Sequence, residues 1–326
     1  YCKTMNKMKK ISALLVSGLL LLHSNFTIAQ TKDDATNAYN RGVELASTDL
    51  PKAVEALIEA VDIAEKAGDE AADILQLASQ QIPLLQYNYS TSLYKEKKLD
   101  ESIAGFILAR DYSVKYKDES TKAKAEELLP KLYLSKGNGE MKDNKLAEAL
   151  ESFDKALAYD SSFSKAYLLK GIVFKKQNKF DEMKAAMDKA IETGTASNDD
   201  KTVASASKTV SDDYIINANS AFKKGNFSEV ISLLDESVKY VADNPEAYYL
   251  YALANNKLSK WDDAITSAEK GMSLDENTPE KQARFYFEMG MAQSGKNDTG
   301  AACASFKKAA VGPLAESANY QIKTVL

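Results

Sequence analysis

Residues 144–157 read NKLAEALESFDKAL, and 34 residues later the chain reads NKFDEMKAAMDKAI at residues 178–191. In both stretches the apolar side chains recur at spacings of three, four and three residues, which is the pattern of one face of an α-helix. The first copy carries Leu146, Ala149, Phe153 and Ala156, and the second carries Phe180, Met183, Met187 and Ala190. A repeat at this offset predicts an array of helical units.

The same pattern recurs along most of the chain. Seven segments share it and indicate second helices near residues 50–67, 99–116, 146–159, 180–193, 227–241, 261–273 and 299–310. Glycine and proline are scarce, at 14 and 6 of 326 residues, which is typical of helical proteins. The length also exceeds that of a usual single-core domain, so two domains or an elongated repeat array are favoured.

A first helix is expected before each of these segments, joined to it by a short turn. The turns FKKQNKF (174–180) and FKKGNF (222–227) place lysines at the end of the first helix, then Asn or Gly where a left-handed residue is needed. The next helix opens with acids such as Asp181 and Glu182, which are favourable at its positive end. One hairpin cannot cover its own apolar face, so we expect the hairpins to stack.

These residues resemble the tetratricopeptide repeat, a family of helix hairpins. Two consecutive units match the family pattern of small and aromatic positions, with Gly137, Leu146, Ala149, Phe153 and Ala156 in one and Gly171, Phe174, Phe180 and Ala190 in the next. The resemblance implies an all-α fold over residues 30–326. It would be a right-handed α-solenoid of about seven helix hairpins, with a capping helix near residues 313–326.

Three units are longer than the repeat period. Each carries 13 to 15 extra residues, at 67–81, 117–129 and 197–210, and because none is a glycine-rich linker we expect extra helical turns ahead of the first helix. Pro83 and Pro130 then fall inside helical stretches, where a proline removes a backbone hydrogen bond and kinks or breaks the helix. We therefore expect bends close to both prolines.

Residues 1–29 have a different composition. Lysines near the start precede the apolar run ISALLVSGLLLL (11–22), and the small residues Thr27 and Ala29 precede the expected cleavage point. This is the pattern of a secretory signal peptide, and residues 1–4 read as an over-extended start. The apolar run is shorter than the roughly 20 residues that a membrane span needs. We expect a periplasmic protein, with secretion or anchoring by an uncleaved signal as alternatives.

The charge and residue types of the remaining chain narrow its chemistry. Loss of the signal removes four lysines and no acid, so the formal charge changes from −5 to −9, which is poorly suited to nucleic acid or anionic lipid surfaces. His23 is the only histidine and lies in the signal, and Cys303 is the only cysteine beyond it, expected to be a small buried hydrophobe. We predict no catalytic residue, no metal and no cofactor, and we do not expect an enzyme.

In the tetratricopeptide repeat family, partners usually lie in a concave groove lined by the first helix of each unit. Carried to this sequence, the resemblance implies a partner-binding group that we call the groove set: Asn138, Met141, Ile172, Lys175, Asn219, Phe222, Tyr249, Asn256 and Met291. Some members grip a peptide's C-terminal carboxylate with Lys, Asn and Arg. Here Asn138 fits that clamp, but the other positions hold Leu134, Leu169, Asp212 and Ile216, so we reject it.

The groove is thus expected to be apolar with asparagines, which suits an amphipathic helix or an extended segment. The leading hypothesis is a non-enzymatic protein–protein interaction scaffold of the cell envelope that holds a partner segment in this groove. One alternative is a periplasmic protein that binds a small molecule or glycan through Tyr248, Tyr249 and Tyr251, which cannot all point the same way on a helix. Self-association through the terminal units is a further possibility.

Overall fold

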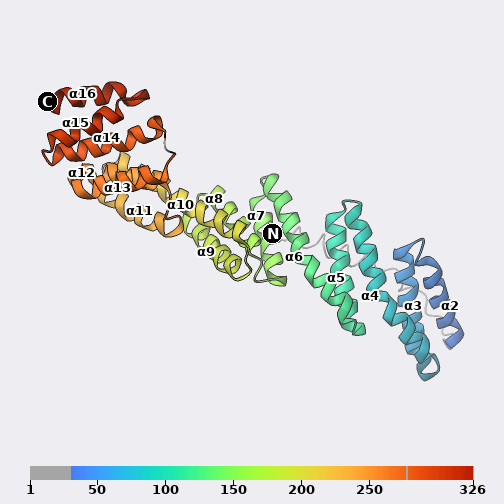
Figure 1. The fold of residues 1–326 in the computed structure, drawn as a ribbon. Helices are drawn as coiled ribbons and strands as arrows, with labels where there is room; N and C mark the ends of the chain where they lie inside the picture. The colour runs from blue at the N-terminus through green and yellow to red at the C-terminus, as the bar shows by residue number, and fades with distance from the viewer. Residues whose placement is uncertain (1–30, 277, 326) are drawn as a thin grey trace. The chain divides into compact units, whose positions relative to one another are not determined.

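Helix hairpins make up the described part of the chain. The computed structural model describes residues 31–276 and 278–325. Within these ranges there is no strand, and consecutive helices pack in pairs (Figure 1). The prediction of an all-α array of helix hairpins is therefore confirmed. The chain divides into two compact units, residues 1–125 and 126–326, and each is described by itself.

The first unit contains two hairpins. They comprise α2 (Lys32–Leu45) with α3 (Leu50–Ala67), then the 3-10 helix η1 (Gly68–Ala71), then α4 (Ala72–Lys95) with α5 (Leu99–Tyr116). Helix α3 also packs against α4, so the two hairpins stack. Leu57, Val61 and Ile82 are fully buried in the core between them. Each hairpin covers apolar surface that its neighbour would otherwise expose to water.

The second unit continues the same order. Helix α6 (Glu119–Lys142) begins in the first unit, and the second unit then contains α7 (Leu146–Tyr159), α8 (Ser164–Lys176), α9 (Phe180–Ala196), α10 (Asp200–Lys223), α11 (Phe227–Tyr240), α12 (Pro245–Lys257), α13 (Trp261–Leu274), α14 (Pro279–Gly295), α15 (Thr299–Ala309), the 3-10 helix η2 (Gly312–Leu314) and α16 (Ala315–Val325). Even-numbered helices from α6 to α14 are the first helices of hairpins. Helix α16 packs on α15 and η2.

Small residues on the first helices allow the second helices to approach closely. A Cβ atom added at Gly137 would lie 2.5 Å from Cε1 of Phe153, and one added at Gly171 would lie 2.6 Å from Cε of Met187. Phe153 and Met187 are fully buried, so these contacts belong to the core. Close packing of this kind leaves no room for an extra methyl group without displacement of the neighbouring side chain.

The hairpin turns share one backbone conformation. Left-handed φ angles occur at Lys97, Asn144, Asn178, Gly225, Ser259 and Asn297, one in each of six turns. After Asn178, the N–H of Lys179 donates to the carbonyl oxygen of Phe174 at 3.0 Å, which is the long bond of a Schellman motif. The predicted left-handed residues Asn178 and Gly225 are therefore confirmed.

The residue that follows the turn repeats its geometry in three of these hairpins. Lys98, Lys145 and Lys260 occupy the N-cap position of the next helix. Their φ and ψ angles are −87° and 70°, −86° and 68°, and −88° and 70°. These angles differ by only a few degrees, although the residues come from three different hairpins. The joint between the two helices is thus nearly the same in these three hairpins, whereas Lys179 at the corresponding position has φ and ψ of −99° and 84°.

The three longer units differ from the others in their first helices. Helices α4, α6 and α10 each have 24 residues, whereas α8 and α12 each have 13, so the extra residues form the expected helical turns. Pro83 and Pro130 lie inside α4 and α6, and neither proline ends its helix. The expected bends at these prolines stay predictions.

The predicted signal peptide, residues 1–29, lies outside the described residues. Among the helices that the structure does describe, none is both long enough and apolar enough to cross a membrane.

Candidate functional site

All nine residues of the groove set lie in the second unit, on first helices of its hairpins. Helix α8 packs against α10, α10 against α12, and α12 against α14, so most of the set belongs to neighbouring helices. Eight of the nine side chains are half-buried, and Met291 is 36% exposed. The set therefore forms a partly covered surface, and its polar members need hydrogen-bonding partners.

Lys175 connects two neighbouring first helices. Its Nζ atom lies 2.5 Å from Oδ1 of Asp213, which joins α8 to α10 through a carboxylate that is 18% exposed. A partly buried ion pair is screened less by salt than an exposed one. Lys175 is therefore engaged inside the protein, and it does not present a free cation to a partner. Asp213 is a site residue that the sequence analysis did not select.

Asn256 connects α12 and α14, the first helices of two neighbouring hairpins. Its Nδ2 donates to Oε2 of Glu288 at 2.8 Å and to the Glu288 carbonyl oxygen at 3.0 Å, so α12 is tied to α14. The other amide atom, Oδ1, is buried and has no hydrogen-bond partner. A buried acceptor without a donor costs roughly 1–3 kcal/mol. Asn256 thus makes two bonds and leaves one polar atom unsatisfied.

Glu288 is an acid in a buried position. Glu288 is 6% exposed, and the pKa of its carboxyl group is raised above the ordinary value of 4.5, chiefly because burial disfavours the ionised form. The Asn256 amide and the charge of Lys257 act in the opposite direction. Glu288 lies about one repeat after Asn256, on the neighbouring first helix, and the sequence analysis did not select it.

Arg284 lies one helical turn before Glu288 and makes a second connection between α12 and α14. Its Nη1 is 2.6 Å from Oε2 of Glu246, and its Nη2 is 2.8 Å from Oδ2 of Asp275, a carboxylate that is 10% exposed. The guanidinium also lies 4.8 Å from the ring centre of Tyr249, at cation–π distance. These contacts hold α12, the segment before α14 and α14 itself together.

The three neighbouring tyrosines of α12 divide between two sides of the helix. Tyr249 faces α14, where its ring meets Phe285 edge-on at 5.9 Å. Tyr251 faces α11, where its hydroxyl donates to Oδ1 of Asp235 at 2.6 Å, and Tyr248 lies 5.9 Å from Tyr251. Burial raises the pKa of Tyr249 and of Tyr251. All three rings are half-buried.

The middle of the groove set has apolar and amide character. Phe222 packs edge-on against Phe227 at 5.2 Å, which fixes its ring at the end of α10. Asn219 turns its Nδ2 back to the carbonyl oxygen of Ile215 at 3.1 Å. The amide oxygen of Asn219 can then accept a hydrogen bond from an N–H donor of a partner. This part of the face can contact apolar side chains and also accept a hydrogen bond.

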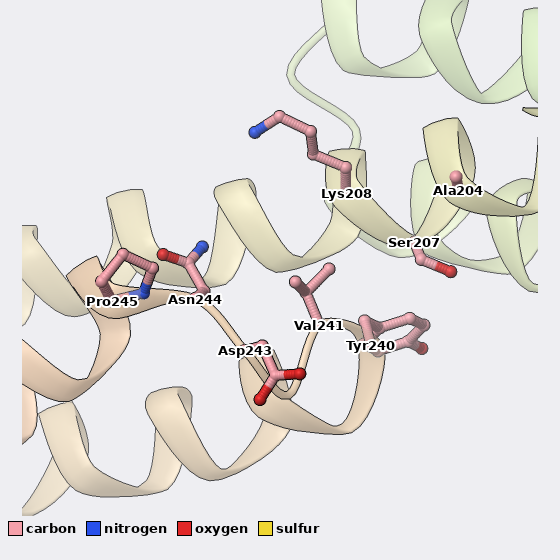
Figure 2. A pocket seen from close by; sticks show the side chains of 8 residues that line it. All are labelled: Ala204, Ser207, Lys208, Tyr240, Val241, Asp243, Asn244 and Pro245. Carbon is pink, nitrogen blue, oxygen red and sulfur yellow. The ribbon is translucent and has the colours of Figure 1, made fainter. Parts of the chain in front are cut away.

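A hollow of ≈ 550 Å³ lies elsewhere on the second unit, between the first turns of α10 and the segment that joins α11 to α12 (Figure 2). It is lined by Ala204, Ser207, Lys208, Tyr240, Val241, Asp243, Asn244 and Pro245, none of which belongs to the groove set. Tyr240 donates its hydroxyl to Asp188, Lys208 pairs with Asp212, and Asn244 caps α12. Most of its polar groups are thus already engaged.

Comparison with known proteins gives family matches over much of the second unit. Residues 134–198 match a family model described as tetratricopeptide repeat, and residues 199–271 match one described as anaphase-promoting complex, cyclosome, subunit 3. No curated protein matches the chain.

Three solved structures illustrate the likeness to known folds. The MamA protein is 21% identical over 56% of this chain and 91% of that chain, with a TM-score of 0.35. A tetratricopeptide repeat protein from Parabacteroides merdae is 17% identical over 89% and 98%, with a TM-score of 0.30. The TPR2AB domain of yeast Sti1 in complex with pHSP90 is 15% identical over 90% and 98%, with a TM-score of 0.34. At these TM-scores the structures say nothing about what this chain binds.

Proposed function

Because the chain is a tetratricopeptide repeat protein, we propose that it is a non-enzymatic scaffold that holds a segment of a partner protein against the first helices of its second unit. The proposal rests on the residue types of the groove set. Its lysine is paired with Asp213 and its tyrosine packs against Phe285, and the contact surface that remains combines apolar side chains with amides.

That combination favours a protein segment over a small charged ligand. Ile172, Phe222 and Met291 supply apolar contacts, while Asn138 and Asn219 supply amides. An amide can pair with the backbone of an extended segment, and apolar side chains can take up every second residue of a strand or one face of a helix. An anion would instead require a free cation, and Lys175 is already paired with Asp213.

A photo-crosslinking experiment tests where the partner lies. A photoreactive amino acid is placed at Phe222 or Met291 on the first helices, and at Ser232 or Glu269, exposed residues of the second helices α11 and α13, as matched controls. We expect one partner segment to be captured from both groove positions and from neither control position. Equal capture from all four positions, or none from any, would contradict the proposed groove.

The captured segment then allows a binding measurement. A synthetic peptide of that sequence is titrated into the protein, and we expect Phe222→Ala and Met291→Ala to weaken binding by about tenfold each, since each change removes buried apolar contact. Glu269→Ala is the control and should leave the affinity unchanged. A peptide that binds all three variants equally would place the partner on another surface.

We also propose that the protein acts in the cell envelope, most simply in the periplasm. The support is the signal-like sequence of residues 1–29. Fractionation of cells that express the whole sequence, or residues 30–326 alone, tests this proposal. We expect the whole sequence to yield a shortened periplasmic protein and residues 30–326 to stay in the cytoplasm. The same compartment for both would contradict export.

A further inference from the structure

Glu288 and Asn256 form an incomplete pair of side chains. The amide donates to the carboxyl group at 2.8 Å, yet the amide oxygen beside that contact is buried and has no donor. An ionised carboxylate offers only acceptors, whereas a carboxylic acid offers one O–H donor as well. The proton that would neutralise Glu288 is therefore the same proton that would give the orphaned amide oxygen a partner.

We propose that Glu288 is held as the neutral acid and that it forms with Asn256 a two-bond acid–amide clasp between α12 and α14, which loses the bond to the amide oxygen when the acid ionises. In this clasp Asn256 donates through Nδ2 and Glu288 donates through its acid O–H to Oδ1. The inference goes beyond partner binding, because it concerns the contact between α12 and α14, whether or not a partner is bound.

The surroundings of the clasp agree with this assignment. Glu288 is 6% exposed, so water does not solvate its charge well, and burial raises its pKa. The titratable groups that interact with it are Tyr249 and Lys257 of α12, while Arg284 on its own helix pairs with Glu246 and Asp275. Among the described residues, α13, α15 and the 3-10 helix η2 also pack against α14, and the charge that lowers the pKa of Glu288 is that of Lys257 on α12.

The clasp predicts how folding depends on pH. Glu288 has a folded pKa above its unfolded value of 4.5, so its contribution is fully present below pH 4.5. As the pH rises from 4.5 toward the folded pKa, the unfolded chain loses its proton while the folded chain keeps it, and stability falls. For a single group the folding equilibrium constant declines by at most about tenfold per pH unit in this window.

Urea unfolding across this pH window tests the clasp with two variants. Glu288→Gln keeps the shape and always carries a donor, so it should lose the decline with pH that the natural chain shows. Glu269→Gln removes an exposed acid of α13 and should keep that decline. If both variants follow the natural chain, the clasp is overturned.

Carbon-13 NMR of the natural chain gives a second test that does not depend on a variant that folds. We expect the carboxyl carbon of Glu288 to titrate above the exposed glutamates, with the Asn256 side-chain N–H signals shifting at the same midpoint. Titration of Glu288 near 4.5, or Asn256 signals that stay fixed while Glu288 titrates, would overturn the proposal.

Discussion

At the scale of single residues, the hairpins depend on small side chains that face large ones. Gly137 allows the ring of Phe153 to lie against the backbone of α6, and both residues occupy positions that the repeat pattern identifies. Periodicity could predict such pairs because they recur in several units, as at Gly171 with Met187 and Gly290 with Phe306. It could not predict Asp213, Glu288 or Arg284, because their partners come from a neighbouring unit and do not recur at a fixed spacing.

Two glycines of α6 provide a matched test of this packing. A Cβ at Gly137 would lie 2.5 Å from Phe153, whereas one at Gly139, two residues later, meets nothing within 4 Å. Gly137→Ala should lower the free energy of unfolding by roughly 1–3 kcal/mol through overpacking. Gly139→Ala should raise it by about 0.5–1 kcal/mol, because alanine has the higher helix propensity. Urea unfolding measures both; equal effects would show that Gly137 has no special packing role.

At the scale of helices, a side-chain cap fixes the start of α10, one of the longer first helices. Asp199 caps α10: its carboxylate accepts from the backbone N–H of Thr202 at 3.2 Å and from the Ser164 hydroxyl at 2.8 Å. These bonds, with that of Thr202 as the largest contribution, lower the pKa of Asp199. Asp199 therefore links the start of α10 to the start of α8. The cap lies inside one of the extra segments, so the family pattern did not predict it.

Changes at Asp199 separate the capping bond from the charge. Asp199→Ala should lower the free energy of unfolding by about 1 kcal/mol, the usual cost of a lost cap, whereas Asp199→Asn keeps an acceptor and should cost less. Because the folded pKa lies below the unfolded one, the contribution of the charge is present above the unfolded pKa and is lost as the pH falls through the folded pKa. Unfolding measured at pH 7 and pH 3 checks this. A larger cost for Asp199→Asn than for Asp199→Ala would contradict it.

At the scale of the whole molecule, each hairpin contacts mainly its neighbours within its own unit, so the effect of removing one helix should stay local. Helix α16 packs on α15 and η2, and its Ala318 is fully buried. The all-α hairpin array was predictable from the repeat, because one period determines every unit. The continuation of α4 and α6 through Pro83 and Pro130 was not, because a proline's effect depends on whether the surrounding packing outweighs the lost hydrogen bond.

Removal of α16 tests this local behaviour. A chain that ends at Ala310 should show faster amide hydrogen exchange in α15, which loses α16, and in α14, which loses η2, while α8 and α9 keep their protection. Tyr320→Ala is the control, since Tyr320 is 64% exposed and its loss should change little. A uniform loss of protection across residues 126–310 would instead indicate one cooperative core.

The near-identical joints at Lys98, Lys145 and Lys260 bear on how such a chain changes its length over generations. Recombination between two of these positions would delete or duplicate a whole hairpin. The backbone where the two parts meet would keep a conformation that it already adopts. Length can thus vary by whole hairpins, while changes on the first helices alter recognition independently.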